Sequence, residues 1–188
     1  SLKKQSIQMI KKLLDCEFVH IMRLDEETQE LYYQKSELNK NGKNFTFEVR
    51  LPVDELTFAG ACAHLQAVLH IEDIKSDIRY GRLSDSEKNK DWRNGLMIPM
   101  IRAGNLLGVI QAVNSNKGKF TEEDIVFSET IAAQFALAVE NSILFEKQQQ
   151  QFLQVVESLA DAIVKKDHYT GGHTKRVGVF SEMIALEL

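Results

Sequence analysis

The sequence predicts an α+β domain in which helices flank a mostly antiparallel sheet. Apolar and polar residues alternate in several short segments between positions 16 and 113, as in strands with one solvent-facing side. Turn-forming residues separate several of these segments by only a few positions, which favours antiparallel neighbours. Apolar residues with helical spacing occur at both ends of the chain and once between the strands. Such an order of elements is typical of a layered α+β domain.

The first half of the chain predicts one helix, three strands and a second, shorter helix. Asn, Lys and Gly at 39–43 form a strong turn signal between the second and third strands. Acidic residues followed by an apolar repeat favour a short helix over 54–65. The preceding elements are expected over residues 2–14 (helix), 16–22, from 31 onward, and 45–51, where Pro52 ends the third strand.

A brief extended segment at 67–71 and two further strands are expected in the second half. Residues 72–91 are polar and loop-rich, with a short helix expected near 84–92. The strand over 95–101 contains Pro99, which lacks an N–H donor, so a bulge or a sheet edge is expected there. A tight turn at 103–105 then leads into the last strand at 106–113.

A long C-terminal helix is predicted to begin at Thr121, with acidic residues in its first turn. No Pro or Gly follows before Gly171, so the segment is one very long helix or two in tandem. A narrow stripe with 4-3 spacing on such a helix favours pairing with a partner helix, and packing within the chain is the alternative. The stripe comprises Phe145, Gln149, Phe152, Val156, Leu159 and Ile163, and its polar member is expected to set the register of a homodimer.

Composition excludes several classes of function. The net charge of −4 and the absence of a dense Lys/Arg run argue against nucleic acid or an anionic membrane as partner. No run of 18 apolar residues is present, so no membrane span is expected. Cys16 and Cys62 are too few for a disulfide framework or a metal knuckle, and reduced, buried thiols in a cytoplasmic protein are expected.

Several short motifs between residues 51 and 141 occur in a characteristic order. They include Leu51-Pro52-Val53 with Phe58-Ala59-Gly60, Leu69-His70-Ile71-Glu72-Asp73-Ile74, Met97-Ile98-Pro99-Met100, the run from Gly104 to Asn114, and Phe120-Thr121-Glu122-Glu123-Asp124. Together the motifs resemble a GAF domain, a small-molecule-sensing fold, over about residues 5–146. The resemblance implies a pocket over one face of the sheet, lined by Phe58, His64, Asp73, Arg79, Tyr80, Trp92 and Met97.

One alternative to a ligand pocket remains open: these side chains could instead fill a collapsed core. His64 alone could ligate haem, but a lone histidine of this kind is more often structural or exposed. The resemblance also extends to part of the cyclic-nucleotide signature of some GAF domains, at Asn114, Phe120 and Asp124. Ser115 and Ile125 replace its lysine and final acid, which argues against a cyclic nucleotide, and the matching residues also suit a helix start.

The segment Asp167-His168-Tyr169-Thr170-Gly171-Gly172-His173, followed by Arg176-Val177, resembles the opening of an HD-GYP domain. That family comprises metal-dependent phosphodiesterases that hydrolyse cyclic di-GMP. The resemblance implies that His173 is one ligand of a divalent metal (Fe, Mn or Zn), and Tyr169 at a glutamate position implies two metals rather than three. The adjacent His-Asp pair of the family does not follow, and one imidazole cannot hold a metal, so no cofactor and no catalysis are expected in these 188 residues.

These observations predict three regions: 1–146 as a GAF-like sensory domain, 147–166 as a coiled-coil linker helix, and 167–188 as the start of an HD-GYP-like domain. The expected function is that of a sensory, dimerising module in a bacterial signalling protein whose full-length form is a cyclic di-GMP phosphodiesterase. A dimerisation scaffold without ligand, or a metal-dependent phosphohydrolase as the parent, are the alternatives.

Overall fold

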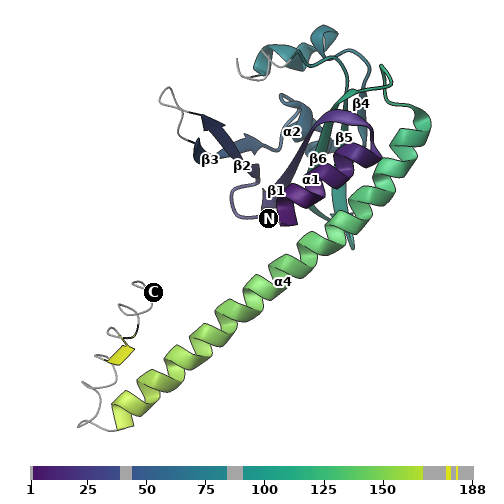
Figure 1. Ribbon diagram of the computed structural model, residues 1–188. Coiled ribbons are helices and arrows are strands. Elements are labelled where there is room, and N and C mark those ends of the chain that lie inside the picture. Colours follow the sequence, from purple (N-terminus) through teal and green to yellow (C-terminus); the bar gives the residue numbers. More distant parts are fainter. Residues whose placement is uncertain (1, 39–43, 84–90, 167–176, 179–180, 182–188) are drawn as a thin grey trace. The chain divides into compact units, whose positions relative to one another are not determined.

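The computed structural model describes residues 2–38, 44–83, 91–166, 177–178 and 181 (Figure 1). The chain divides into two compact units, Ser1–Glu140 and Asn141–Leu188. The expected helix near 84–92 lies largely outside the described residues.

A six-stranded sheet forms the centre of the first unit, with strand order β3-β2-β1-β6-β5-β4. Neighbouring strands pair antiparallel throughout this described sheet, which confirms the predicted α+β class. The first and last strands along the chain, β1 and β6, pair at the centre of the sheet although they are far apart in sequence. The strands are β1 (Cys16–Asp25), β2 (Glu30–Leu38), β3 (Asn44–Pro52), β4 (Leu69–Ile71), β5 (Gly95–Arg102) and β6 (Asn105–Ser115).

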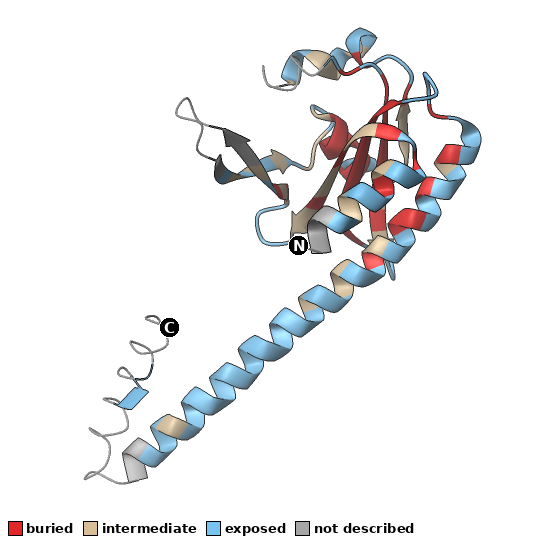
Figure 2. Ribbon diagram, in the orientation of Figure 1, coloured by how far each residue is buried: buried red, intermediate tan, exposed pale blue. Residues whose placement is uncertain are grey.

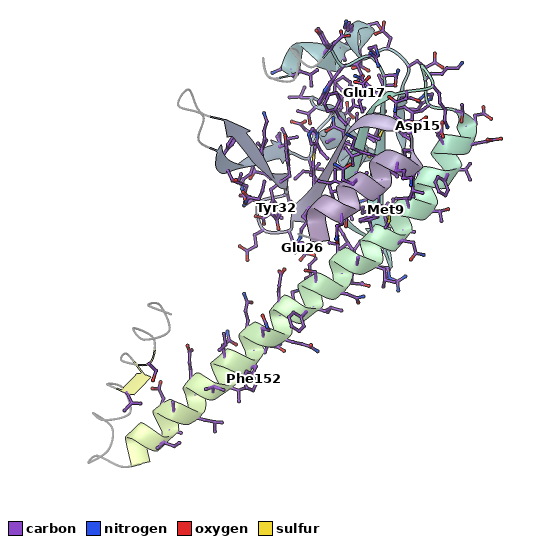
Figure 3. The ribbon with its side chains drawn as sticks, in the orientation of Figure 1. Met9, Asp15, Glu17, Glu26, Tyr32 and Phe152 are labelled. Atoms are coloured by element: carbon purple, nitrogen blue, oxygen red, sulfur yellow. The ribbon has the colours of Figure 1, made fainter. Side chains whose placement is uncertain are left out.

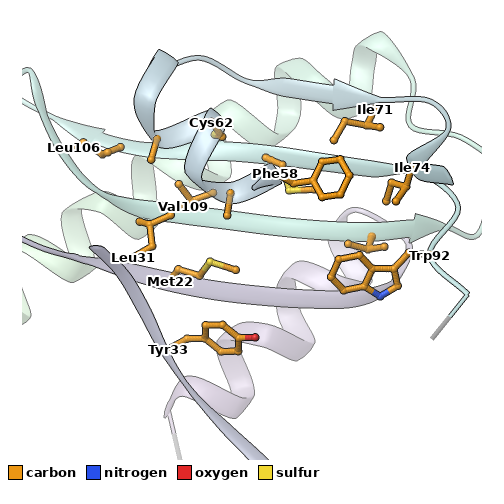
Figure 4. Packing of buried hydrophobic residues seen from close by; sticks show 14 residues of the cluster. Met22, Leu31, Tyr33, Phe58, Cys62, Ile71, Ile74, Trp92, Leu106 and Val109 are labelled. Carbon is orange, nitrogen blue, oxygen red and sulfur yellow. The ribbon is translucent and has the colours of Figure 1, made fainter. Parts of the chain in front are cut away.

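Helices cover both faces of the sheet (Figures 1 and 4). Helix α2 (Phe58–Leu65) packs on β5 and β6, on the face that carries Met22 and Val109. Helix α1 (Leu2–Leu13) packs against β1 and, together with the first turns of α4 (Glu122–Lys166), covers the other face. Two short 3-10 helices, η1 (Ile74–Ser76) and η2 (Ile78–Arg82), follow β4.

The core lies between α2 and the sheet (Figure 4). Phe58 of α2 packs with Met97 and Val109, while Trp92 closes the cluster near the start of β5. Each of these side chains is almost completely removed from water. The core thus occupies the face on which a GAF-like pocket was expected.

The helix expected over 54–65 begins later, at Phe58. The Asp54 carboxylate accepts a hydrogen bond from the Leu56 N–H (2.9 Å) and holds a turn in place of a helical start. Thr57 is the N-cap, because its Oγ1 accepts from the Gly60 N–H (3.0 Å). The predicted start was therefore wrong: the acidic residues precede the helix instead of occupying its first turn.

Pro99 lies in β5 where the ladder is incomplete. Strand β4 pairs only with Gly95–Met97, so Pro99 lies beyond the reach of β4, and the register with β6 shifts between Met100 and Ile101. Both the sheet edge and the nearby irregularity agree with the expectation from the missing N–H donor.

Helix α4 is continuous to Lys166, which decides between one helix and two in tandem. Within the first unit it buries Ile131, Ala132 and Ala136. From Asn141 to Ile163 nearly every residue is exposed (Figure 2). No helix of the described residues is both long enough and apolar enough to cross a membrane.

Candidate functional site

A small cavity of about 40 Å³ lies at the N-terminal end of α2. Three parts of the fold surround it: the end of β3 with the first residues of α2, the 3-10 helix η2, and the middle of β6. Its lining residues are Leu51, Thr57, Phe58, Ala59, Arg79, Arg82, Leu83 and Gln111.

Arg79 is held in place at the wall of this cavity. Its Nε and Nη2 donate to the two carboxylate oxygens of Asp77, at 2.7 and 2.6 Å, and its guanidinium lies 5.3 Å from the centre of the Phe58 ring. The hydrogen bonds with Asp77 raise the pKa of Arg79, and the same bonds lower the pKa of Asp77. The bidentate pair keeps a fixed cation beside an aromatic ring.

Gln111 of β6 is a polar residue in an otherwise apolar sheet face, and it is only 4% exposed. Its Oε1 lies 3.4 Å from Nδ1 of His20 in the paired strand β1. Because an amide oxygen can only accept, the contact is a hydrogen bond in the His20 tautomer that carries its proton on Nδ1. The His20 ring in turn stacks on Tyr33, with centroids 5.3 Å apart. None of these three residues was among the predicted site residues, although a polar residue within an apolar strand face was a usable signal.

The predicted pocket residues divide into three groups. Phe58 and Arg79 line the cavity. Trp92 and Met97 lie fully within the core, and Tyr80 packs against its margin. The fold thus brings five of the seven residues to one side of the sheet.

Asp73 and His64 are placed elsewhere. Asp73 is exposed and caps η1, accepting from the Lys75 N–H at 3.0 Å. His64 is half exposed, with Nε2 3.7 Å from the Glu55 carboxylate, and it lines a separate, open, polar hollow of about 560 Å³. Helix periodicity explains its position. His64 follows Phe58 by six residues on α2, and at about 100° per residue its side chain is turned about 240° away from that of Phe58.

The residues that match the cyclic-nucleotide signature form a structural joint away from the cavity lining. Asn114 is fully buried with φ of 61°, and its side chain accepts from the Arg93 N–H (2.7 Å) and donates to Glu17 (2.9 Å). Phe120 is buried just before α4. The joint fixes the path from β6 into the C-terminal helix.

Asp124 completes the joint through a capping box. Its Oδ2 accepts from the N–H and Oγ1 of Thr121 (2.9 and 3.0 Å), whose Oγ1 accepts from the Asp124 N–H (3.2 Å). Lys117 supplies a cation 2.9 Å from Oδ1, although Ser115 occupies the lysine position of the signature. Burial alone raises the pKa of Asp124, but the hydrogen bonds from Thr121 and Lys117 outweigh burial and lower it.

Replacing Asp124 with alanine is expected to lower the free energy of unfolding by about 1–2 kcal/mol, since a buried cap is lost. The lowered pKa also predicts how stability depends on pH. The Asp124 carboxylate stabilises the fold at pH values above the ordinary aspartate pKa, and this contribution is lost as the pH falls from there through the lowered pKa of the folded state. Urea unfolding at neutral and acid pH measures both effects. A wild-type stability profile in the variant would contradict the capping role, and Glu122→Ala in the exposed first turn is the control.

The two cysteines are buried and free, as expected. Burial raises the pKa of the Cys16 thiol to about 11 and that of Cys62 to about 12. Both thiols are therefore protonated near neutral pH and poor nucleophiles.

The predicted metal ligand His173 and its neighbours at 167–176 lie outside the described residues. Among the residues that are described, no group of three or more His, Cys, Asp or Glu side chains could hold a metal ion.

The predicted seam lies on the second unit's part of α4 and is exposed to water. Its apolar members Phe145, Phe152, Val156, Leu159 and Ile163 are between 45% and 68% exposed. Phe152 extends from the helix surface in Figure 3. A helix seldom leaves such a regular apolar stripe uncovered.

Comparisons with known proteins extend this description. A model of the GAF domain family matches residues 6–140, which is most of the chain. A Caenorhabditis elegans protein described as "Probable 3',5'-cyclic phosphodiesterase pde-5" is 25% identical over 162 residues, which cover 79% of this chain and 22% of that protein. The chain therefore spans about a fifth of that relative's length.

Two solved structures show the same fold. The GAF domain of an Acinetobacter phosphoenolpyruvate-protein phosphotransferase is 19% identical, with a TM-score of 0.58 over 73% of this chain and 80% of that one. A GAF domain/HD domain protein from Geobacter sulfurreducens is 13% identical, with a TM-score of 0.56 over 76% and 92% of the two chains.

Proposed function

The chain belongs to the GAF domain family, and on this premise we propose that it is the small-molecule-sensing, dimerising module of a bacterial signalling protein. A GAF domain is a regulatory domain, so the module itself carries no catalysis. The cavity at the N-terminal end of α2 receives the ligand, and helix α4 transmits the resulting conformational change of the domain. Such transmission requires a ligand that binds one of two states of the module more tightly.

The exposed stripe of α4 is the observation that carries this proposal. Five apolar side chains from Phe145 to Ile163 recur with 4-3 spacing on a helix with little other cover. A second copy of the same helix matches that spacing, because knobs from one seam fit holes in an identical one. Gln149 within the seam opposes Gln149 of its twin and favours a single register.

The parent protein is proposed to be an HD-GYP phosphodiesterase that hydrolyses cyclic di-GMP in the cytoplasm. The motif from Asp167 to Val177 supports this, as does the likeness to a structure described as a GAF domain/HD domain protein. His173 would ligate a divalent metal (Fe, Mn or Zn), which supplies a metal-bound hydroxide for attack on phosphate. A different metal-dependent phosphohydrolase is the alternative parent.

A scaffold without ligand is the second candidate for the module itself. It is favoured by the small cavity and by the way Trp92 and Met97 fill the core. Thermal unfolding distinguishes the two. The purified chain is melted alone and with cyclic AMP, cyclic GMP, amino acids, organic acids and phosphate. A raised melting temperature with any of them supports the sensor, because a ligand that binds only the folded state stabilises it. No shift with any compound supports the scaffold.

A further inference from the structure

We propose that the cavity at the N-terminal end of α2 is selective for a small oxyanion, the carboxylate or phosphate group of its ligand. This inference rests on the proposed sensory function and adds the chemical class of what is sensed. Three independent kinds of donor converge on the cavity, and each belongs to a described residue.

Positive charge is the first of the three. Arg79 and Arg82 both line the cavity, and no acidic residue is among its described lining residues. Both oxygens of Asp77 are engaged by Arg79, which turns that carboxylate away from any ligand and leaves the second cation, Arg82, without such a partner in the lining. An anion therefore meets the guanidinium of Arg82 directly, whereas the Asp77 carboxylate offsets the charge of Arg79.

Backbone donors are the second. Thr57 caps only the Gly60 N–H, and the next helical bond is that of Ala61 to the Thr57 carbonyl. The N–H groups of Phe58 and Ala59, both in the cavity lining, therefore have no intrahelical acceptor. Free N–H groups at the start of a helix carry partial positive charge and favour anions.

The buried amide of Gln111 is the third and is independent of the helix. Its Oε1 is used by His20, so its Nε2 is the end left for the cavity. Within the described part of the chain no hydrogen bond from this Nε2 occurs, although Gln111 is almost completely buried. The fully buried side-chain atoms without a partner in the described chain do not include this Nε2, so the atom is accessible from the cavity, and an anionic oxygen there would accept a hydrogen bond from it.

The size of the cavity limits the occupant. Its volume of about 40 Å³ is a few times the roughly 10–15 Å³ that a cavity needs in order to hold one water. An oxyanion group fits this space better than a nucleobase does. The single hydroxyl in the lining, that of Thr57, already accepts from Gly60, so donors predominate and a cation finds few acceptors.

The test uses isothermal titration and thermal unfolding of the 188-residue chain with sodium phosphate, sodium acetate and methylammonium chloride, at ionic strength held constant with sodium chloride. We expect phosphate or acetate to bind and raise the melting temperature, and methylammonium to do neither. The two anion arms distinguish a phosphate from a carboxylate ligand.

Three variants locate the binding. Gln111→Glu keeps the shape and the acceptor for His20 but replaces the donor with a negative oxygen, so anion binding should be lost. Arg82→Ala removes an exposed cation and should weaken binding about tenfold, a typical effect of one charge-assisted contact. Arg102→Ala, an exposed arginine outside the cavity lining that pairs with Glu140, should bind like the wild type.

Anion binding that survives both Arg82→Ala and Gln111→Glu would overturn the inference. Failure of both phosphate and acetate to bind the wild-type chain would overturn it as well. The proposed function has a separate outcome. If an uncharged compound raises the melting temperature and Gln111→Glu abolishes that rise, the cavity is a sensor site but not an oxyanion site. Circular dichroism shows whether each variant is folded. If Gln111→Glu does not fold, Arg82→Ala alone decides the test.

Discussion

Gly108→Ala is expected to destabilise the domain by about 3 kcal/mol, the upper part of the range for an overpacked core. Gly108 lies in β6 between Arg23 of β1 and Met100 of β5. A Cβ at this position would overlap the carbonyl oxygen of Met22 and lie 2.7 Å from Cε of Met100. The methionine end can move, but the carbonyl belongs to the central strand pair and can yield only if β1 moves away from β6.

Urea unfolding followed by circular dichroism measures this loss as a lower midpoint. Gly81→Ala is the matched control, because a Cβ there meets no atom within 4 Å. Its free energy of unfolding should stay within about 0.5 kcal/mol of the wild type, as for ordinary surface changes. Equal midpoints for Gly108→Ala and the wild type would show that β1 and β6 are packed less closely than the structure has them.

Phe152→Glu is expected to convert a dimer of the chain into monomers. Burying one phenylalanine side chain contributes about 1.5–3 kcal/mol, and a symmetric seam loses two. Two carboxylates would also face each other in its place. The combined loss corresponds to a dissociation constant at least about a hundredfold weaker. Analytical ultracentrifugation over a range of concentrations measures the change directly.

Gln150→Glu provides the control for charge alone. It adds the same carboxylate two positions earlier on α4, which turns it about 200° around the helix from Phe152. This variant should remain dimeric. A wild-type chain that sediments as a monomer at every concentration would instead remove the seam from the proposed function.

Local chemistry accounts for the parts of the fold that the sequence predicted well. The alternation of Phe47 and Val49 with polar neighbours identified β3, since a strand turns successive side chains to opposite faces. Thr121 and Asp124 identified the start of α4, because a capping box is closed within four residues. The start of α2 was misplaced for a related reason: Asp54 competes locally for a backbone N–H, and composition does not reveal which of two caps prevails.

The cavity was only partly predictable. Phe58 and Arg79 were expected in the pocket and do line it, whereas His64 was assigned to the pocket but lies in a different hollow. Gln111 and His20 were missed, because their contact joins positions 91 residues apart and exists only once β1 and β6 are in register. The pattern of residues within β1 or β6 does not determine the register between the two strands, so it does not predict which residues will lie opposite each other.

Periodicity, caps and turns therefore defined this protein's elements, their order and the apolar stripe of its last helix, because each depends on residues within a few positions of one another. The convergence of Arg79, Gln111 and the first residues of α2 on one small cavity was decided by the tertiary structure. Strand register and the packing of α2 on the sheet set those distances, and both are collective results of burying the core.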